Sequence, residues 1–363
     1  MPVDPGMGEN LSARVASIVA DAELALLRLL AALLRDGDDD SWVQTRLAAV
    51  QQLRVDLQRG VRSLDQAVVA EIQKVVLEAY NVGSGLALDD LQVADVAPAV
   101  AADPVVAAAA LAAPAVTSAR AAANRLPTML TEVFQQAVAA GADEVLGGKV
   151  TRLQAAQHVL DRLTSNGVGG FVDKAGRNWA LTSYVEMAVR TASGQAAVQG
   201  HVDSLAAAGL DLVIVSDAPR ECPLCRPYEG QILSLSGQVG DVVTKSVVDD
   251  KSVRVHVFAT LAQARAAGLQ HPNCRHSLSA FLPGATERKI ARRDPVGYEA
   301  TQRQRAMERK VREWKRREAV ALTPETAAYA RSKTRDWQKA LREHVDANDL
   351  KRLSRREQID RAT

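Results

Sequence analysis

All three cysteines of the chain fall into two short motifs whose residue types and spacing suit metal binding. The first motif reads Cys-Pro-Leu-Cys, with Cys222 and Cys225, and the second reads His-Pro-Asn-Cys, with His271 and Cys274. Two ligands separated by two residues can turn toward one ion, and four Cys and His ligands complete a tetrahedral structural zinc site. The sequence therefore predicts a structural Zn²⁺ held by Cys222, Cys225, His271 and Cys274.

A second histidine leaves the fourth ligand open. His276 lies two residues after Cys274, where it competes with His271 for the metal or supports the site through a hydrogen bond from outside it. The plain alternative to metal binding is that the cysteines are small buried apolar residues. Their placement in two paired motifs favours zinc.

The same residues do not match the patterns of catalytic zinc. A catalytic site keeps a position open for water and usually has a carboxylate nearby. Zinc deaminases combine His-x-Glu with Pro-Cys-x-x-Cys, whereas Glu221 precedes the first cysteine and no His-x-Glu lies upstream. His271, Asn273 and His276 are too close together for a His-Asn-His nuclease, and no P-loop, Gly-x-Gly-x-x-Gly or Gly-x-Ser-x-Gly motif occurs. We expect a protein that is not an enzyme; the alternative is a zinc-dependent, nuclease-like enzyme that processes nucleic acid.

Length and composition predict a mainly helical protein with several domains. The 363 residues are 47% apolar, 24% charged and only 4% aromatic, and alanine and leucine favour helices. Three cysteines cannot close a set of disulfides, and the start of the chain has acidic residues where a signal peptide is basic, so we expect a reducing cytoplasm. The apolar run at 104–116 contains proline and is too short for a membrane span of about 20 residues, so no membrane partner is expected.

The first 85 residues predict a helical hairpin resembling a coiled coil. Apolar residues recur in steps of three and four over 11–34 and again over 47–75. Gly60 predicts a local irregularity, and the sequence Asn-Val-Gly-Ser-Gly at 81–85 predicts the end of the second helix. The long apolar seam of the second helix also suits self-association of two copies.

The rest of the chain divides into four segments by composition and periodicity. They are a linker rich in Ala, Val and Pro at 86–117, a helical connector at 118–168, a small α+β domain at 169–284 and a basic helical tail at 285–363. The two cysteine motifs lie inside the α+β domain. The fold class is therefore mainly α with a small central α+β domain that contains the zinc knuckles.

The tail carries an excess of positive charge. Residues 287–363 hold 22 Lys and Arg against 13 Asp and Glu. This excess predicts contact with a polyanion such as DNA, or with an acidic partner surface. The alternative is a solvated pair of helices laced with salt bridges. The candidate contacts lie within fifteen residues: Arg303, Arg305, Arg309, Lys310, Arg312, Lys315, Arg316 and Arg317.

Four stretches, in a fixed order, resemble the minor capsid proteins of tailed phages. They read YVEMAVRTA, GLDLVIVSD, CPLCRPYEGQILSLSG and GLQHPNCRHSLSAFLPG. The chain is similar there to the minor-capsid-2 group, which is related to the F-type head morphogenesis protein of phage Mu. The resemblance covers about 171–283, and the helix at 302–320 is also similar to the C-terminal helices of that group.

The resemblance implies a virion protein present in few copies near the portal of the phage head. It would be made in the cytoplasm of the bacterial host and act in head assembly, DNA packaging or DNA ejection, with portal proteins, capsid proteins and phage DNA as partners. No catalytic residues come with the resemblance, and zinc is not guaranteed because some relatives lack the first pair of ligands. Glu186 and Arg190 match the family pattern, and their spacing predicts an ion pair on one helix face.

Overall fold

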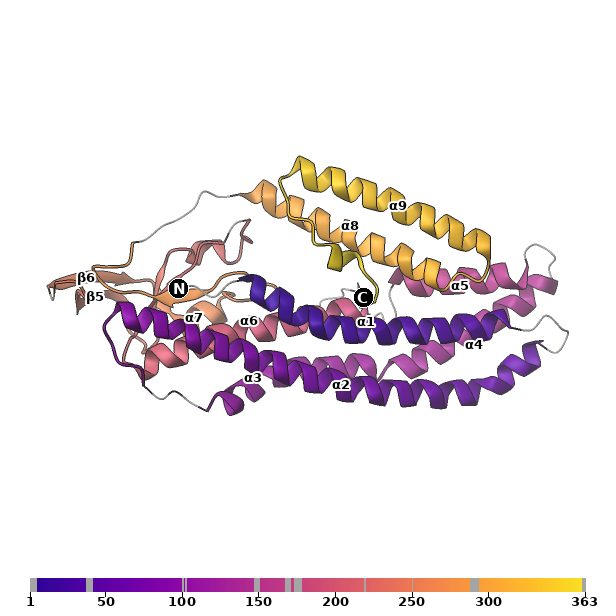
Figure 1. Cartoon of the computed structure of the whole chain (residues 1–363), viewed down its shortest axis with the longest axis horizontal. Coiled ribbons are helices and arrows are strands. Elements are labelled where there is room, and N and C mark those ends of the chain that lie inside the picture. Colours follow the sequence, from indigo (N-terminus) through magenta and orange to yellow (C-terminus); the bar gives the residue numbers. More distant parts are fainter. Residues whose placement is uncertain are drawn as a thin grey trace. The chain divides into compact units, whose positions relative to one another are not determined.

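The computed structural model consists mostly of helices with a small sheet-containing region (Figure 1). It divides into two compact units that are each assembled from three segments: 1–14, 70–116 and 186–299 form the first unit, and 15–69, 117–185 and 300–363 form the second. The residues that the structure describes are 5–36, 42–99, 101, 103–146, 151–166, 171–172, 178–218, 220–249, 251–287 and 294–360. Whether the five predicted segments act as separate domains stays a prediction.

Two long helices form the predicted N-terminal hairpin. They are α1 (Pro5–Arg35) and α2 (Trp42–Val93), and Figure 1 shows them side by side. Gly60 does not disturb α2, because the glycine lies in the contact between the two helices. A Cβ atom at Gly60 would be 3.6 Å from the Cδ2 atom of Leu26.

The prediction that the second helix ends at 81–85 is wrong. In α2 the glycine serves close packing instead of chain reversal, because α6 (Leu181–Ala207) crosses there. A Cβ atom at Gly83 would lie 1.8 Å from the carbonyl oxygen of Ala197, and one at Gly200 would lie 2.1 Å from that of Tyr80. Only glycine lets the two backbones approach this closely.

The predicted linker at 86–117 is also largely helical. Its first residues continue α2 to Val93, and α3 (Pro104–Ala123) begins eleven residues later. Proline suits the first position of a helix, and the alanine run that follows has the highest helix propensity. Pro114 removes one backbone donor without ending α3, so the Ala-rich context outweighs the proline.

One apolar stretch passes a test of length and composition for a membrane span. It runs from Pro104 to Ala140, and 28% of its most apolar window is buried. The expectation that this region is too short is therefore wrong on length. The stretch is divided by a turn at 124–125 into α3 and α4 (Leu126–Leu146). Pro127 predicts a helix boundary at this place. Core helices of soluble proteins pass the same membrane test. The expected absence of a membrane partner stays a prediction.

The sheet-containing region holds the two cysteine motifs. A four-stranded sheet has the order β7-β4-β3-β8, and only the β4–β7 pair is parallel. A separate antiparallel hairpin joins β5 to β6. The strands are β3 (Leu212–Val215), β4 (Ile232–Ser234), β5 (Gly240–Lys245), β6 (Ser252–Val257), β7 (Ala259–Thr260) and β8 (Leu278–Ala280), and the short helix α7 (Leu261–Ala266) follows β7. The apolar or alternating segments at 211–217, 230–237 and 252–259 predict strands, which β3, β4 and β6 confirm. Strands β5, β7 and β8 were not predicted.

The four-stranded sheet packs against α2 and α6. Val213, Leu233 and Leu278 share one buried cluster with Leu91 of α2 and Val202 of α6. The free edge of β8 is also covered, because the backbone N–H of Ala280 donates to a carboxylate oxygen of α2, that of Asp90, at 2.9 Å. This apolar cluster supports the loops on which the cysteines lie.

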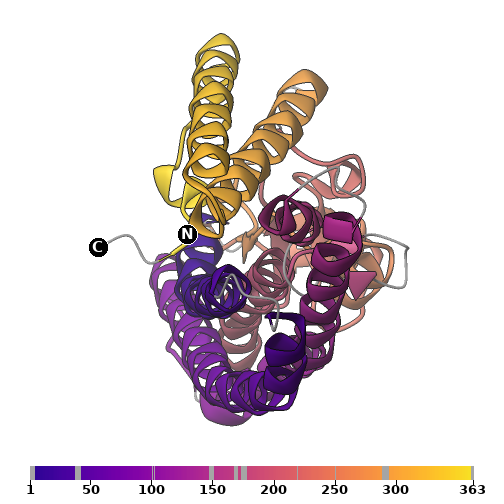
Figure 2. The same ribbon diagram turned by 90° about the vertical axis from the view of Figure 1, so that its right-hand side faces the viewer.

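The remaining elements belong to the helical connector and the tail. They are α5 (Arg152–Asn166), the short antiparallel pair β1 (Phe171–Val172) and β2 (Asn178–Trp179), α8 (Pro295–Ala319) and α9 (Pro324–Ala347). Figures 1 and 2 both show α9 running back along α8. Thr323 followed by Pro324 predicts the cap and first position of a helix, and α9 confirms it, because the Thr323 hydroxyl accepts from the backbone N–H of Thr326. The alternating segment at 171–181 predicts a small hairpin, whose central residues lie outside the described residues.

Candidate metal centre

The first cysteine motif forms a tight turn after β3. The backbone N–H of Cys225 donates to the carbonyl oxygen of Cys222 at 3.2 Å, and a single 3₁₀ turn, η1 (Arg226–Tyr228), follows. Gly230 then has a φ of 66° and donates to the carbonyl oxygen of Val215 at 3.0 Å. This turn brings both cysteine side chains to one side before β4 begins.

The second motif lies in the loop between α7 and β8. The backbone N–H of Cys274 donates to the carbonyl oxygen of His271 at 2.9 Å, which closes a turn like that of the first motif. Gln270 and Asn273 have φ values of 61° and 66°, in the left-handed region that asparagine tolerates better than most residues. The loop therefore presents His271 and Cys274 together.

The predicted ligands converge into one cluster. The Sγ atom of Cys225 lies 3.5 Å from that of Cys274, which in turn lies 3.5 Å from Nδ1 of His276. The Sγ atom of Cys222 lies 2.8 Å from Nε2 of His271. Cys225 belongs to both triads of ligand atoms, and within each triad all atoms lie within 4.8 Å of one another. Tetrahedral zinc separates sulfur and nitrogen ligands by about 3.5–3.8 Å, from its bond lengths, so the distances of Cys274 to Cys225 and to His276 fit this ion, whereas Cys222 and His271 lie closer together.

Each histidine has one ring nitrogen turned to an oxygen and the other to a cysteine. Nδ1 of His271 lies 2.8 Å from the carbonyl oxygen of Pro272, and Nε2 of His276 lies 2.7 Å from Oε1 of Glu229. In metal sites the second nitrogen of a ligating histidine has an acceptor of this kind, which sets the tautomer and the ring orientation. Both histidines are therefore arranged as ligands.

The carboxylate behind His276 is the part of the site that the sequence did not predict. The side chains of Glu229 and His276 are only 1% and 2% exposed. A guanidinium N–H of Arg226 donates to Oε2 of Glu229 at 2.8 Å, and the backbone N–H of Ala218 donates to Oε1 at 3.2 Å. In the sequence, Glu229 stands in Arg-Pro-Tyr-Glu-Gly-Gln, where Pro227 and Gly230 predict a turn rather than a contact to the metal site.

Charges within the cluster favour a thiolate at Cys274. Its hydrogen bond with Cys225 lowers the pKa of the Cys274 thiol to about 4, against the effect of burial, and His276 lowers it further. The same hydrogen bond and burial raise the pKa of Cys225. Burial lowers the pKa of His276, but Cys274 and Glu229 outweigh it and raise the pKa overall. The site thus stabilises a thiolate beside a positive charge, and a divalent cation can supply that charge in place of a proton.

Arg190 on α6 holds the second motif in place. The guanidinium pairs with Glu186 one turn earlier, as predicted, and also donates to Oδ1 of Asn273 at 3.1 Å. The backbone N–H of Asn273 donates to the hydroxyl of Thr191 at 3.4 Å. The family-like residues of this helix therefore anchor the left-handed turn beside Cys274.

A polar network fixes the residue that precedes His271. Nε of Arg265 donates to Oε1 of Gln270 at 2.8 Å, and the same guanidinium donates to Gln199 at 2.9 Å. Gln199 and Tyr80 each donate to Asp203 at 2.6 Å. The network joins α2, α6 and α7 to the metal-binding loop.

The eight predicted contact residues all lie on α8, and several have partners on the same helix. Arg305 lies 3.8 Å from Glu308, and Glu313 accepts from Lys310 at 2.7 Å and pairs with Arg317 at 3.1 Å. Glu308 and Glu313 are buried, at 2% and 6% exposed, so these cations neutralise carboxylates inside the fold. These ion pairs therefore occupy Arg305, Lys310 and Arg317, which the sequence predicts to contact DNA or a partner protein.

The end of the chain uses two more of these cations. Residues 351–358, the C-terminal strap, pack against α8, where Arg312 donates to the carbonyl oxygen of Arg356. The ammonium group of Lys315 donates to Oε1 of Gln358 at 2.7 Å. Both α8 side chains therefore bind the chain itself.

The remaining three cations differ in their surroundings. Arg316 lies close to Glu23, which is 3% exposed and accepts from the hydroxyl of Thr182 at 2.5 Å. Burial raises the pKa of Glu23, and the charge of Arg316 opposes this shift. Arg303 and Arg309 are exposed. The role of the eight residues in binding DNA or a partner stays a prediction.

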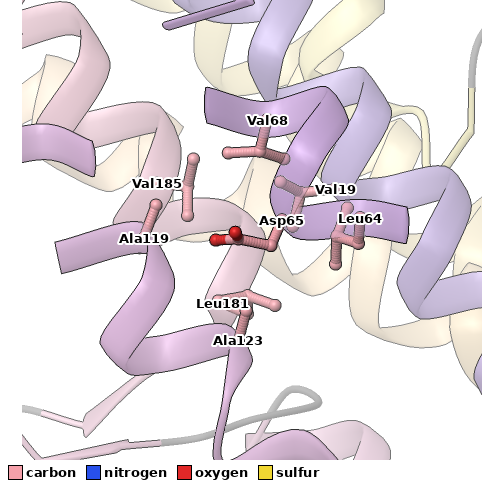
Figure 3. A pocket seen from close by; sticks show the side chains of 8 residues that line it. All are labelled: Val19, Leu64, Asp65, Val68, Ala119, Ala123, Leu181 and Val185. Carbon is pink, nitrogen blue, oxygen red and sulfur yellow. The ribbon is translucent and has the colours of Figure 1, made fainter. Parts of the chain in front are cut away.

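A small cavity in the second unit is unrelated to this cluster. It has a volume of about 10 Å³ and is lined mainly by apolar residues, with Asp65 at its wall (Figure 3). Asp65 accepts from Nε of Arg120 at 3.0 Å. A volume of this size is at the lower limit for a single water molecule, so the cavity is no substrate pocket.

Comparison with known families agrees with the resemblance of the four sequence stretches. The family model of phage minor capsid protein 2 matches residues 3–346. The chain belongs to this family. The match extends the similarity from the central region to the N-terminal helices and to α8 and α9 of this minor capsid protein. No curated protein and no solved structure shows a significant match to the chain.

Proposed function

We propose that this minor capsid protein lies near the portal of the phage head and acts in head assembly, DNA packaging or DNA ejection. The observation that supports the proposal is the match of nearly the whole chain, residues 3–346, to a family of minor capsid proteins. A protein that occurs in few copies belongs at a unique position of the shell, and the portal vertex is such a position.

Quantitative mass spectrometry of purified DNA-filled particles tests this role. The number of copies should follow the number of portal subunits, and particles assembled without portal protein should lack the chain. A copy number that follows the major shell protein would contradict the proposal. The shell protein of the same particles provides the internal control.

We also propose that the cysteine cluster holds one structural zinc ion. Three thiolates and one imidazole would fill all four positions, so no position stays open for a catalytic water. Metal analysis of purified protein should give one zinc per chain, and the Cys222→Ser, Cys225→Ser double variant should give none. Zinc-free native protein that keeps its fold would overturn this proposal.

The geometry favours His276 over the predicted His271 as the fourth ligand. The distance of 3.5 Å between Cys274 and His276 is that of two ligands on one zinc ion, whereas 2.8 Å between Cys222 and His271 is shorter. The buried Glu229 also orients His276, while His271 is half-buried and has only a backbone acceptor. Zinc titration should show a larger loss of affinity for His276→Ala than for His271→Ala; the reverse order would restore the prediction from the sequence.

The basic tail completes the proposal as a contact to phage DNA. Its support is the local excess of positive charge, and a protein inside a filled head meets DNA as the most abundant polyanion. Contact would be directed at phosphates and would weaken as salt rises. Removing residues 285–363 should abolish retention on duplex DNA at low salt; unchanged retention would refute this part.

A further inference from the structure

The second helix of the tail, α9, presents a line of cations that are separate from the eight candidate contacts on α8. Arg331, Arg335, Lys339 and Arg342 follow one another on α9 at steps of four, four and three residues. Such steps keep side chains on one side of a helix, about 6 Å apart along its axis. All four residues are exposed, and together they are called the α9 basic stripe.

The stripe is little occupied by contacts within the chain. Arg331 pairs with Glu318 at 3.0 Å, and Lys339 lies 3.9 Å from Glu343, with both cations more than half exposed. Among the residues that the structure describes, Arg335 and Arg342 have no carboxylate within 4.0 Å. Exposed pairs exchange at little cost, so the stripe is available to a ligand.

The first tail helix, α8, has fewer cations that are available to a ligand. Arg312 and Lys315 bind the C-terminal strap, and Arg316 lies close to Glu23. A polyanion would have to displace these partners. The observed contacts therefore move the available charge from α8, where the sequence placed it, to α9.

We infer that the α9 basic stripe binds the phosphate backbone of DNA without regard to base sequence. Guanidinium groups bind phosphate oxygens in a bidentate fashion, and three of the four residues are arginines. On the same side of the helix, the residues next to these cations are Ala328, Ser332 and Gln338, which are small or polar. A protein partner would require a buried aromatic or aliphatic anchor at the centre of the contact, which this line of residues does not offer. Asp346, one turn beyond Arg342 on the same side, marks the end of the stripe.

This inference rests on the proposed presence of the protein in the DNA-filled head, but its test is independent of that role. Binding of the full chain to a duplex of arbitrary sequence is measured by fluorescence anisotropy between about 50 and 200 mM salt. The variant replaces the three least engaged cations: Arg335→Gln, Lys339→Gln and Arg342→Gln. Three released phosphate contacts should lower the slope of log K against log salt by about 2.7. Between the two salt concentrations the native chain should therefore lose about 40-fold more affinity than the variant.

A matched control separates the stripe from general charge. Arg54→Gln, Arg59→Gln and Arg62→Gln remove three exposed cations from α2 and should leave the salt slope unchanged. Equal losses in the two triple variants, or no loss in the stripe variant, would overturn the inference. Polyglutamate that competes as well as DNA, charge for charge, would overturn it in favour of an acidic protein partner.

Two further measurements keep the result interpretable. Circular dichroism should show the same helix content for all variants, and if the triple variant loses helix, single Arg335→Gln and Arg342→Gln variants should each lower the slope by about 0.9. Lysine at both positions should restore the slope, because it keeps the charge. Copy number in particles tests the proposed location separately, so failure of DNA binding and failure of that role give different results.

Discussion

The two regions that the sequence marked as chemically active behave in opposite ways in the structure. The two cysteine motifs are separated by 46 residues between Cys225 and His271, yet their ligand atoms converge into two triads that share Cys225. Residues of the basic run on α8 are neighbours in sequence, yet their contacts are dispersed among ion pairs within the helix, the C-terminal strap and the surroundings of the buried Glu23. Spacing predicts a site well when each residue type has one main use, as cysteine and histidine have here. It predicts poorly for arginine and lysine, which satisfy local carboxylates as readily as a partner.

Metal removal should give the largest difference between the two regions. Structural zinc contributes about 10 kcal/mol or more to the folding of small zinc domains, and the tail has no comparable cluster among its described residues. A chelator should therefore abolish amide protection in β3, β4 and β8 while α9 keeps its protection, as measured by hydrogen exchange with mass spectrometry. The Cys222→Ser, Cys225→Ser variant should not respond to the chelator. Unchanged protection of the sheet in the native chain would contradict the prediction.

Adding a methyl group to a glycine of α2 should destabilise the chain where α2 packs closely against α6 and stabilise it where the helix is exposed. Gly83→Ala places a Cβ atom 1.8 Å from a backbone oxygen, and such overpacking should lower the free energy of unfolding by about 3 kcal/mol. Gly85→Ala, where nothing lies within 4 Å, should raise it by about 0.5–1 kcal/mol. Chemical denaturation of both variants measures the difference. Equal effects would mean that α2 and α6 do not approach as described.

Within α8, removing a buried cation should lower the free energy of unfolding more than removing an exposed one. Arg316→Gln leaves Glu23 without the charge that opposes its raised pKa and should lower the free energy of unfolding by about 2 kcal/mol at a pH where Glu23 of the native chain is ionised. The pKa of Glu23 in the folded chain is raised above its ordinary value of 4.5. The ionised form is therefore the unfavourable one, and stability is lost as the pH rises from that value through the raised pKa.

The pH dependence provides the sharper measurement for this pair. Removing Arg316 raises the pKa of Glu23 further, so the deficit of Arg316→Gln against the native chain should be small near pH 4 and grow as the pH rises through the raised pKa of Glu23. Denaturation curves across this range measure it. Arg303→Gln, on the exposed side of the same helix, should change stability by less than about 0.5 kcal/mol at every pH. A pH-independent deficit would show that Glu23 is not the partner.

The smallest effect concerns the carboxylate behind His276. Glu229→Gln keeps the shape of the side chain but weakens the acceptor at 2.7 Å from Nε2, and loss of such a partner lowers metal affinity by about 10–100-fold. Competition with a zinc-sensitive dye measures this change. The spectrum of the Co²⁺-substituted protein should shift for Glu229→Gln and keep its position for Glu221→Gln, whose carboxylate pairs with Arg226. Identical spectra for the two variants would indicate that Glu229 merely stabilises the loop.

Secondary structure was predictable where one signal dominated. The periodicity of α1, the cap of α9 and the apolar run of β3 each identified an element. Glycine and proline misled at Gly83 and Pro114, because their effect depends on what lies opposite the residue. A glycine that ends an isolated helix can also admit a second backbone, and only the neighbouring helix distinguishes the two uses.

The sequence by itself determined the family of the protein, its mainly helical class and the identity of the candidate metal ligands, because these depend on residue types at fixed spacing. Only the tertiary structure decided which other residues complete the site. Glu229 reaches His276 across 47 residues and Arg190 reaches Asn273 of the second motif across 83 residues, separations at which no periodicity operates. It also decided which cations are available, since a charge that is paired within the fold and one that is exposed look alike in a sequence.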